Sequence, residues 1–126
     1  MFKGSYKNLQ IWQKGIDLAK TIFVLTQSFP KEELYGLTSQ LRRSAISIPS
    51  NTAEGSRRTS DKEFSNFILI ARGSLAEVET QIILAESFGY IHKNESALLL
   101  SKIDELDKML FAFHKRLQAP SSKLQA

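Results

Sequence analysis

Two arginine pairs are the side chains of this chain best suited to binding chemistry. Guanidinium groups bind phosphates and carboxylates through paired hydrogen bonds, and clustered cations bind nucleic acid by neutralising phosphates and releasing counterions. Two lysines of a preceding segment join them if the two segments pack side by side. The candidate nucleic-acid-binding residues are therefore Arg42, Arg43, Arg57, Arg58, Lys14 and Lys20. A charged surface that is merely solvated is the alternative interpretation.

The segment between the arginine pairs places a proline inside a predicted helix. An interior proline lacks the N–H donor and costs about 3 kcal/mol, so packing must over-determine the helix or a kink must be useful. We expect the nearby amide and carboxylate to form hydrogen bonds at this kink, a structural role rather than a catalytic one. The predicted structural cluster is Pro49, Asn51, Glu54 and Gly55. In the alternative interpretation, Pro49 simply begins a new helix.

No pattern of residues predicts an enzyme. The absence of cysteine excludes a thiolate nucleophile and a cysteine-ligated metal. The two histidines, His92 and His114, have no carboxylate or second histidine at metal-ligand spacing, and we interpret His114 as a solvated helix residue. The chain has neither a phosphate-binding loop nor a nucleophile elbow. We therefore expect no catalytic residue, no metal and no cofactor.

The first half of the chain contains two predicted helices. One runs from Leu9 to Gln27 with Asn8 as its N-cap, and the other runs from its cap Thr38 to Arg57. A short turn over residues 31–37 joins them. The first helix has two apolar stripes, Ile11, Leu18, Ile22 and Leu25 being the second. The stripe expected to face the core is Leu9, Trp12, Ile16, Ala19, Phe23 and Thr26.

Two further helices are predicted in the second half. The residues Ser60-Asp61-Lys62-Glu63 form a capping box that opens the third helix, and Gly89 supplies the left-handed residue that closes it. Asn94 is the predicted cap of the fourth helix. No segment alternates with the period of a strand. The fold class is therefore all-α, an antiparallel up-down four-helix bundle in residues 1–119, followed by a flexible tail over residues 120–126.

The predicted helices carry more apolar residues than one bundle needs. Exposed apolar patches usually mark an interface, and identical copies can bury them in a closed ring. A thicker core within one chain is the alternative. The candidate interface residues are Leu18, Leu25, Leu69, Ala76 and Ile83.

Charge and hydropathy set the class of partner. The net charge of the 126 residues is +4, but residues 1–60 carry nine basic and four acidic side chains, and residues 61–90 carry two and five. This asymmetry suits RNA, or the meeting of one copy's basic face with another copy's acidic face. No apolar run is long enough to span a bilayer, and the N-terminus lacks the apolar core of a signal peptide. We expect a cytoplasmic protein with no membrane partner.

Several words of the sequence, in fixed order, resemble one family. They include Tyr35-Gly36-Leu37, Gln40-Leu41-Arg42-Arg43-Ser44-Ala45, the run from Ser47 to Gly55, and Ala71-Arg72-Gly73-Ser74-Leu75. The chain is similar over residues 9–117 to the four-helix bundle proteins encoded within 23S ribosomal RNA intervening sequences. Thr52 stands where that family usually has isoleucine. The accessory proteins of diversity-generating retroelements resemble a branch of the same fold.

The resemblance implies a homopentameric ring of bundles with a basic surface. In the retroelement branch it implies binding to RNA and to a reverse transcriptase, whereas it supplies no catalytic residue for any position of this chain. We therefore expect a non-enzymatic oligomer that binds RNA or a ribonucleoprotein through its basic surface. The alternative is a structural assembly or a protein-partner adaptor with no nucleic-acid role.

Overall fold

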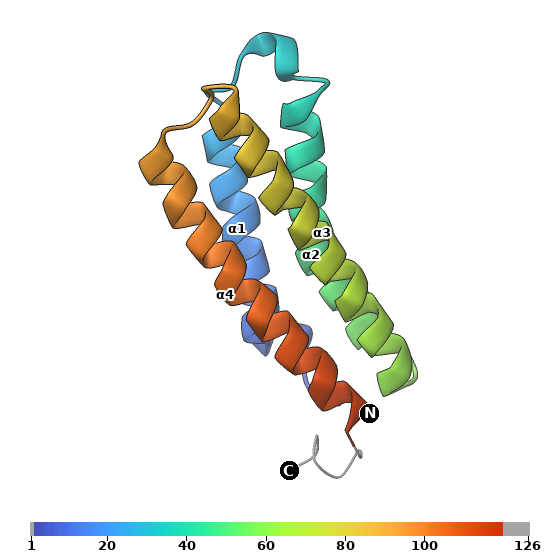
Figure 1. Cartoon of the computed structure of the whole chain (residues 1–126). Coiled ribbons are helices and arrows are strands. Elements are labelled where there is room, and N and C mark those ends of the chain that lie inside the picture. The colour runs from blue at the N-terminus through green and yellow to red at the C-terminus, as the bar shows by residue number, and fades with distance from the viewer. Residues whose placement is uncertain (1, 120–126) are drawn as a thin grey trace.

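The computed structural model describes residues 2–119, and over that range the chain forms helices and no strand. Two short 3-10 helices, η1 (Tyr6–Asn8) and η2 (Lys31–Glu33), precede α1 and α2 respectively. The four α-helices pack into a bundle (Figure 1), which confirms the all-α class. They are α1 (Gln10–Thr26), α2 (Leu37–Ser56), α3 (Asp61–Ser87) and α4 (Lys93–Gln118). The tail predicted for residues 120–126 lies outside the described residues.

Side-chain contacts fix how neighbouring helices lie against each other. Late residues of α1 meet early residues of α2, since Arg42 bonds to Thr26, and Gly15 lies beside Pro49 farther along α2. The same holds between α3 and α4. His114, late in α4, contacts Ser65, early in α3, and Asp107, earlier in α4, contacts Arg72 farther along α3. The ribbon accordingly rises in α1 and α3 and descends in α2 and α4 (Figure 1).

The predicted boundaries of α3 are correct. The Ser60 hydroxyl accepts a hydrogen bond from the Glu63 amide at 3.1 Å, as a capping residue does. At the other end Gly89 has a φ of 81°. The amides of Gly89 and Tyr90 donate to the carbonyls of Glu86 and Ala85 respectively, both at 2.9 Å. This pair of bonds is the Schellman motif, which requires a residue that tolerates positive φ.

The other three predicted caps are wrong. The N-cap positions of α1, α2 and α4 are Leu9, Gly36 and His92, and none makes a side-chain capping bond. Asn8 belongs to η1, while Thr38 and Asn94 already lie inside the first turns of their helices. A side chain from the preceding turn caps the start of α2, because the Leu37 amide donates a hydrogen bond to Glu33 Oε1 at 3.1 Å.

The apolar stripe of α1 that faces the core is the second stripe, and the stripe that was expected to face it does not. Ile11, Leu18 and Ile22 are buried, whereas Phe23 is 50 % exposed. The buried stripe also contains Gly15, beside which Pro49 of α2 packs at 3.4 Å from the position a Cβ would take. Because Gly15 has no side chain, α2 can approach this face of α1 closely, and this face is therefore the one directed into the bundle. In α2 the apolar stripe from Leu41 to Gly55 is buried, and in α4 the stripe from Leu99 to Leu117 is buried.

Pro49 lies inside α2, which continues to Ser56. The alternative in which Pro49 begins a new helix is therefore wrong. Neighbouring helices approach α2 closely at both ends of this segment. Pro49 packs on Gly15, and Gly55 lies against Phe64 and Phe67 of α3.

Candidate interaction surfaces

Arg42 is held against the bundle rather than directed into solvent. Its Nε donates to the Thr26 hydroxyl at 2.8 Å, and its guanidinium carbon lies 4.3 Å from the ring centroid of Phe23. Cation–π and hydrogen-bond contacts of this kind fix a side chain to its neighbours. Arg42 therefore joins α2 to the end of α1, and its availability to a phosphate is reduced.

Arg43 lies on the next face of α2 and is exposed. It makes no hydrogen bond or ion pair with another described residue. Arg43 borders a polar groove between α2 and α3 that is also lined by Ser44, Ser47, Ser74 and Glu77. Of the first arginine pair, Arg43 is thus the side chain free to bind an external anion.

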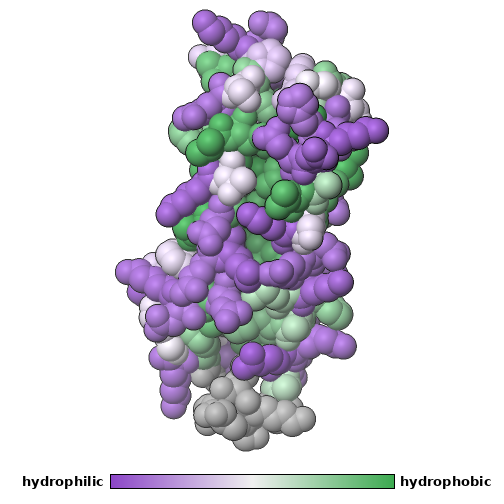
Figure 2. All heavy atoms as spheres, turned by 90° about the vertical axis from the view of Figure 1, so that its left-hand side faces the viewer, coloured by the Kyte–Doolittle hydropathy of each residue, from purple (hydrophilic) through white to green (hydrophobic). Residues whose placement is uncertain are grey.

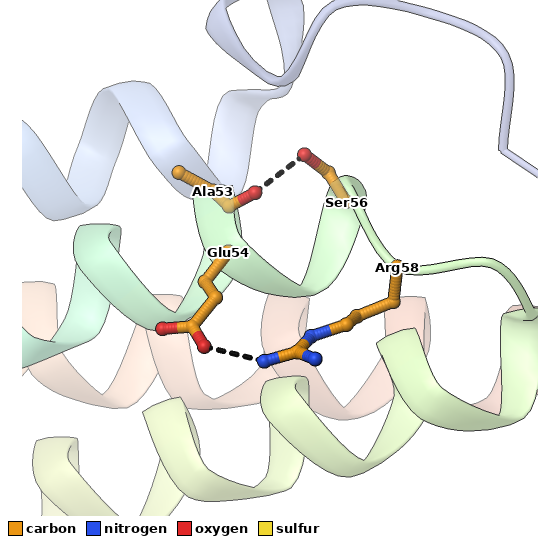
Figure 3. Close-up of polar contacts among 4 residues, drawn as sticks. All are labelled: Ala53, Glu54, Ser56 and Arg58. Atoms are coloured by element: carbon orange, nitrogen blue, oxygen red, sulfur yellow. Dashed lines mark hydrogen bonds and ion pairs between the residues drawn. The ribbon is translucent and has the colours of Figure 1, made fainter.

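The second arginine pair lies at the opposite end of α2. Arg58 forms an ion pair with Glu54 at 2.6 Å (Figure 3) and lies over the ring of Phe67. Arg57 is exposed, with its guanidinium carbon 5.7 Å from the centroid of the Tyr6 ring. The two pairs are fifteen residues apart along one helix, or about 22 Å at the α-helical rise.

The two candidate lysines face α4. Lys14 of α1 forms an ion pair with Glu105 of α4 at 2.6 Å, which lowers the pKa of the Glu105 carboxyl below its ordinary value. Lys20 lines a groove between α1 and α4. The six predicted cations therefore do not converge within one chain, because they lie at both ends of α2 and on the α1–α4 side.

The polar cluster around Pro49 has a smaller membership than predicted. Asn51 Nδ2 donates to the carbonyl and to the hydroxyl of Ser47, both at 2.8 Å, and the Ser47 and Ser74 hydroxyls are 2.8 Å apart. This network links α2 to α3, as a structural role requires. Glu54 is not part of it. Glu54 is exposed and points toward Arg58, while the Ser56 hydroxyl donates to the Ala53 carbonyl beside it (Figure 3).

The environment of His114 differs from the one predicted. His114 is buried rather than solvated, and its Nδ1 lies 2.6 Å from the Ser65 hydroxyl of α3. The prediction failed because the apolar stripe of α4 is wide enough to include this position. Among residues 2–119, no group of three or more His, Asp or Glu side chains could hold a metal ion. In the same range no helix is both long enough and apolar enough to cross a bilayer.

Several large apolar side chains are exposed on the surface. On α3, Leu69 is 43 % exposed and Ile83 is 49 % exposed. Val24 of α1 and Leu98 of α4 are 66 % and 64 % exposed, and both line the groove between their helices. Figure 2, which shows the α4 side of the molecule, has hydrophobic residues gathered in its upper half and framed by hydrophilic ones. Of the predicted interface residues, Leu18 is wrong because it lies in the chain's own core.

Apart from Leu25, the apolar residues of this groove were not assigned to an interface from the sequence. Leu25 was predicted as an interface residue, and it lies half-buried at the floor of the groove. The signal that could have found the groove was Val24, one helical turn beyond Lys20, opposite an apolar run in α4. Its recognition required knowing that α1 and α4 are neighbours.

Helix count, helix lengths and packing together define an all-helical four-helix bundle over the described residues. The sequence pattern of the 23S rRNA-intervening sequence protein family matches residues 7–112. The chain therefore belongs to that family.

One solved structure supports the same fold. It is a crystal structure from Bacteroides thetaiotaomicron of a protein of unknown function from the S23 ribosomal protein family. It superimposes with a TM-score of 0.77 at 24 % sequence identity, covering 83 % of this chain and 95 % of that one. No curated protein matches the chain.

Proposed function

We propose that this chain is a non-enzymatic assembly module, an antiparallel up-and-down bundle whose copies associate into a cytoplasmic oligomer through exposed apolar side chains. The supporting observation is the exposure of Leu69 and Ile83 on α3 together with that of Val24 and Leu98 beside α1 and α4. Large apolar side chains that gather on a monomer surface usually mark a protein interface. A closed ring of five copies is the form that the family resemblance favours.

Sedimentation velocity across a hundredfold range of protein concentration tests this proposal. We expect a mass of several chains, falling toward one chain on dilution. A Leu69→Ser/Ile83→Ser variant is expected to weaken the assembly, because the exposed half of each side chain would lose apolar contact area in the oligomer. Ile46→Ser is a matched control, since Ile46 is 57 % exposed on α2. A wild-type mass of one chain at every concentration would contradict the proposal.

A second candidate function is binding of RNA or a ribonucleoprotein by the assembled copies. Arg43, Arg57 and Lys20 are exposed cations without an ion pair to another described residue. One chain spreads them apart, but an oligomer repeats each of them, and repeated weak sites add through avidity. An adaptor without affinity for RNA is the alternative.

The salt dependence of RNA affinity separates these two functions. Phosphate contacts make the logarithm of the binding constant fall linearly with the logarithm of salt concentration. We expect Arg43→Glu/Arg57→Glu to weaken binding of structured RNA and to flatten that slope, with helical content unchanged. Arg42 is left intact because it contributes to the packing of α1 on α2. RNA affinity of the variant equal to that of the wild type would overturn the assignment of these two arginines, and a wild type without affinity for RNA would assign the protein to the adaptor function.

A further inference from the structure

A groove between α1 and α4 has the form of a docking site for another helix. It has a volume of about 500 Å³, and its walls and floor are Val24, Leu25, Leu98 and Leu99. Lys20 and Lys102 stand at its edges, together with Glu95. The groove exists because α1 contacts α4 more sparsely than any other adjacent pair of α-helices packs.

The side chains of this groove are exposed where a core would bury them. Val24 and Leu98 keep about two thirds of their surface in contact with solvent. Neither Lys20 nor Lys102 forms an ion pair with a described residue. The groove therefore offers apolar surface and two unpaired cations to whatever enters it.

The opposite side of α4 has the reverse charge. A second groove, of about 440 Å³, lies between α3 and α4 and contains the apolar Leu69 and Ala76. Its charged residues are Arg72, Glu79, Asp104 and Asp107, a sum of −2, against +1 for the first groove. Arg72 is engaged by Asp107 at 2.6 Å. Asp104 pairs with Lys108 only at an exposed position, where solvent screens the attraction.

We propose that a second copy of this chain fills the α1–α4 groove with the apolar ridge of its α3, Leu69, Ala76 and Ile83. Lys20 and Lys102 of one copy then face Glu79 and Asp104 of the other. The inference rests on the proposed self-association and names the two surfaces that meet. A second copy is favoured over an unrelated partner because each chain carries both halves, with opposite charge and exposed apolar side chains on each.

The two surfaces are different, so the contact is heterologous. Each copy that docks its α3 ridge still offers its own α1–α4 groove, and the next copy can add to it. Such a contact closes into a ring when the rotation between copies permits, and otherwise extends as a filament. The head-to-tail order distinguishes this inference from a two-fold dimer, in which a single surface would meet itself.

Charge reversal tests the pairing. Lys20→Glu/Lys102→Glu places like charges across the contact, and we expect the dissociation constant of the assembly to rise on the order of 100-fold. Lys7→Glu/Lys62→Glu is the matched control, since it makes the same change in net charge at two exposed positions in η1 and at the start of α3. Sedimentation velocity measures both, with far-ultraviolet circular dichroism to verify the helical content.

Restoration of assembly gives the second arm of the test. Glu79→Lys/Asp104→Lys is expected to prevent assembly in the same way, and a 1:1 mixture of the two charge-reversed proteins is expected to recover it. In the mixture the two variants must alternate, so a ring of five chains cannot close, and the recovered assembly is an open chain of copies or a closed ring with an even number of chains. A chain carrying all four substitutions is expected to assemble by itself.

The outcomes separate this inference from the proposed function. If Lys20→Glu/Lys102→Glu assembled as tightly as the wild type, the pairing of these surfaces would be overturned. The same would follow if neither the mixture nor the fourfold variant recovered assembly. In both cases the proposed self-association would remain valid. A wild-type protein that is monomeric at every concentration would remove the proposed function and this inference together.

Discussion

Gly55 is the position where α2 comes closest to α3. A Cβ at this position would lie 2.6 Å from the Cβ of Phe67 and 2.9 Å from Cδ1 of Phe64. Both phenylalanines belong to a packed helix, so the backbone would have to move. We expect Gly55→Ala to lower the free energy of unfolding by about 1–3 kcal/mol. Chemical denaturation followed by circular dichroism measures the change.

Gly73 of α3 provides the control for this substitution. No atom lies within 4 Å of the position that its Cβ would take, and the residue is exposed. Because alanine favours a helix over glycine by up to about 1 kcal/mol, Gly73→Ala should raise the stability. If the two alanine variants were equally stable, the close approach at Gly55 would not govern the packing of α2 on α3.

Single residues show which contacts could be predicted from the sequence and which could not. Gly55 and the small residues near Pro49 indicate close packing in the sequence itself, because only small side chains allow it. The positions of the arginines were visible, but their partners were not. Arg42 is engaged by Thr26 and Phe23 of another helix, and no spacing within α2 encodes that contact.

At the scale of the element, one predicted cap of four has the expected hydrogen bond. Ser60 accepts from the Glu63 amide, whereas Asn94 lies within α4 and makes no capping bond. We expect Ser60→Ala to cost about 1 kcal/mol of stability and Asn94→Ala to change it by less than half of that. Thermal denaturation of the two variants measures the difference. A larger loss for Asn94→Ala would place the start of α4 elsewhere.

Helix existence was predictable because the apolar period is local, and helix boundaries were less so. The apolar residues of α4 recur at intervals of four and three from Leu99 to Leu117, and all of them are buried in the core. In α1 two stripes competed, and the choice between them depended on Pro49 of α2 packing beside Gly15. Likewise Glu33, in the turn before α2, bonds the first amide of that helix and the Tyr90 hydroxyl, which raises the pKa of Tyr90.

The ion pair between α1 and α4 makes a pH-dependent contribution of known sign. Lys14 lowers the pKa of Glu105, so the pair stabilises the fold above the ordinary carboxyl pKa, and this contribution is lost as the pH falls through the lowered value. We expect Lys14→Met to return the pKa of Glu105 to its ordinary range in an NMR titration. Lys108→Met is the control, because Lys108 of α4 pairs with Asp104 and its removal should leave the pKa of Glu105 unchanged. A pKa of Glu105 that does not move would mean that Lys14 is not its partner in solution.

At the scale of the whole molecule, the bundle leaves apolar surface on two sides of α4 and distributes its cations widely. The fold class follows from periodicity and loop length alone. The interaction surfaces do not, because a groove between α1 and α4 exists only once those helices are neighbours. Val24 and Lys20 come from one helix, and Leu98 and Lys102 come from a helix more than seventy residues later.

Self-association predicts that thermal stability depends on protein concentration. Assembly stabilises the folded chain by mass action, so the melting temperature of the wild type should rise with each tenfold increase in concentration. In Lys20→Glu/Lys102→Glu the dependence should vanish, while the melting temperature at high dilution stays close to that of the wild type, because both lysines are exposed and unpaired in the single chain. Differential scanning calorimetry at three concentrations measures this. A melting temperature that is independent of concentration in the wild type would mean that the apolar groove remains open in solution, and the bundle would then function as a monomer.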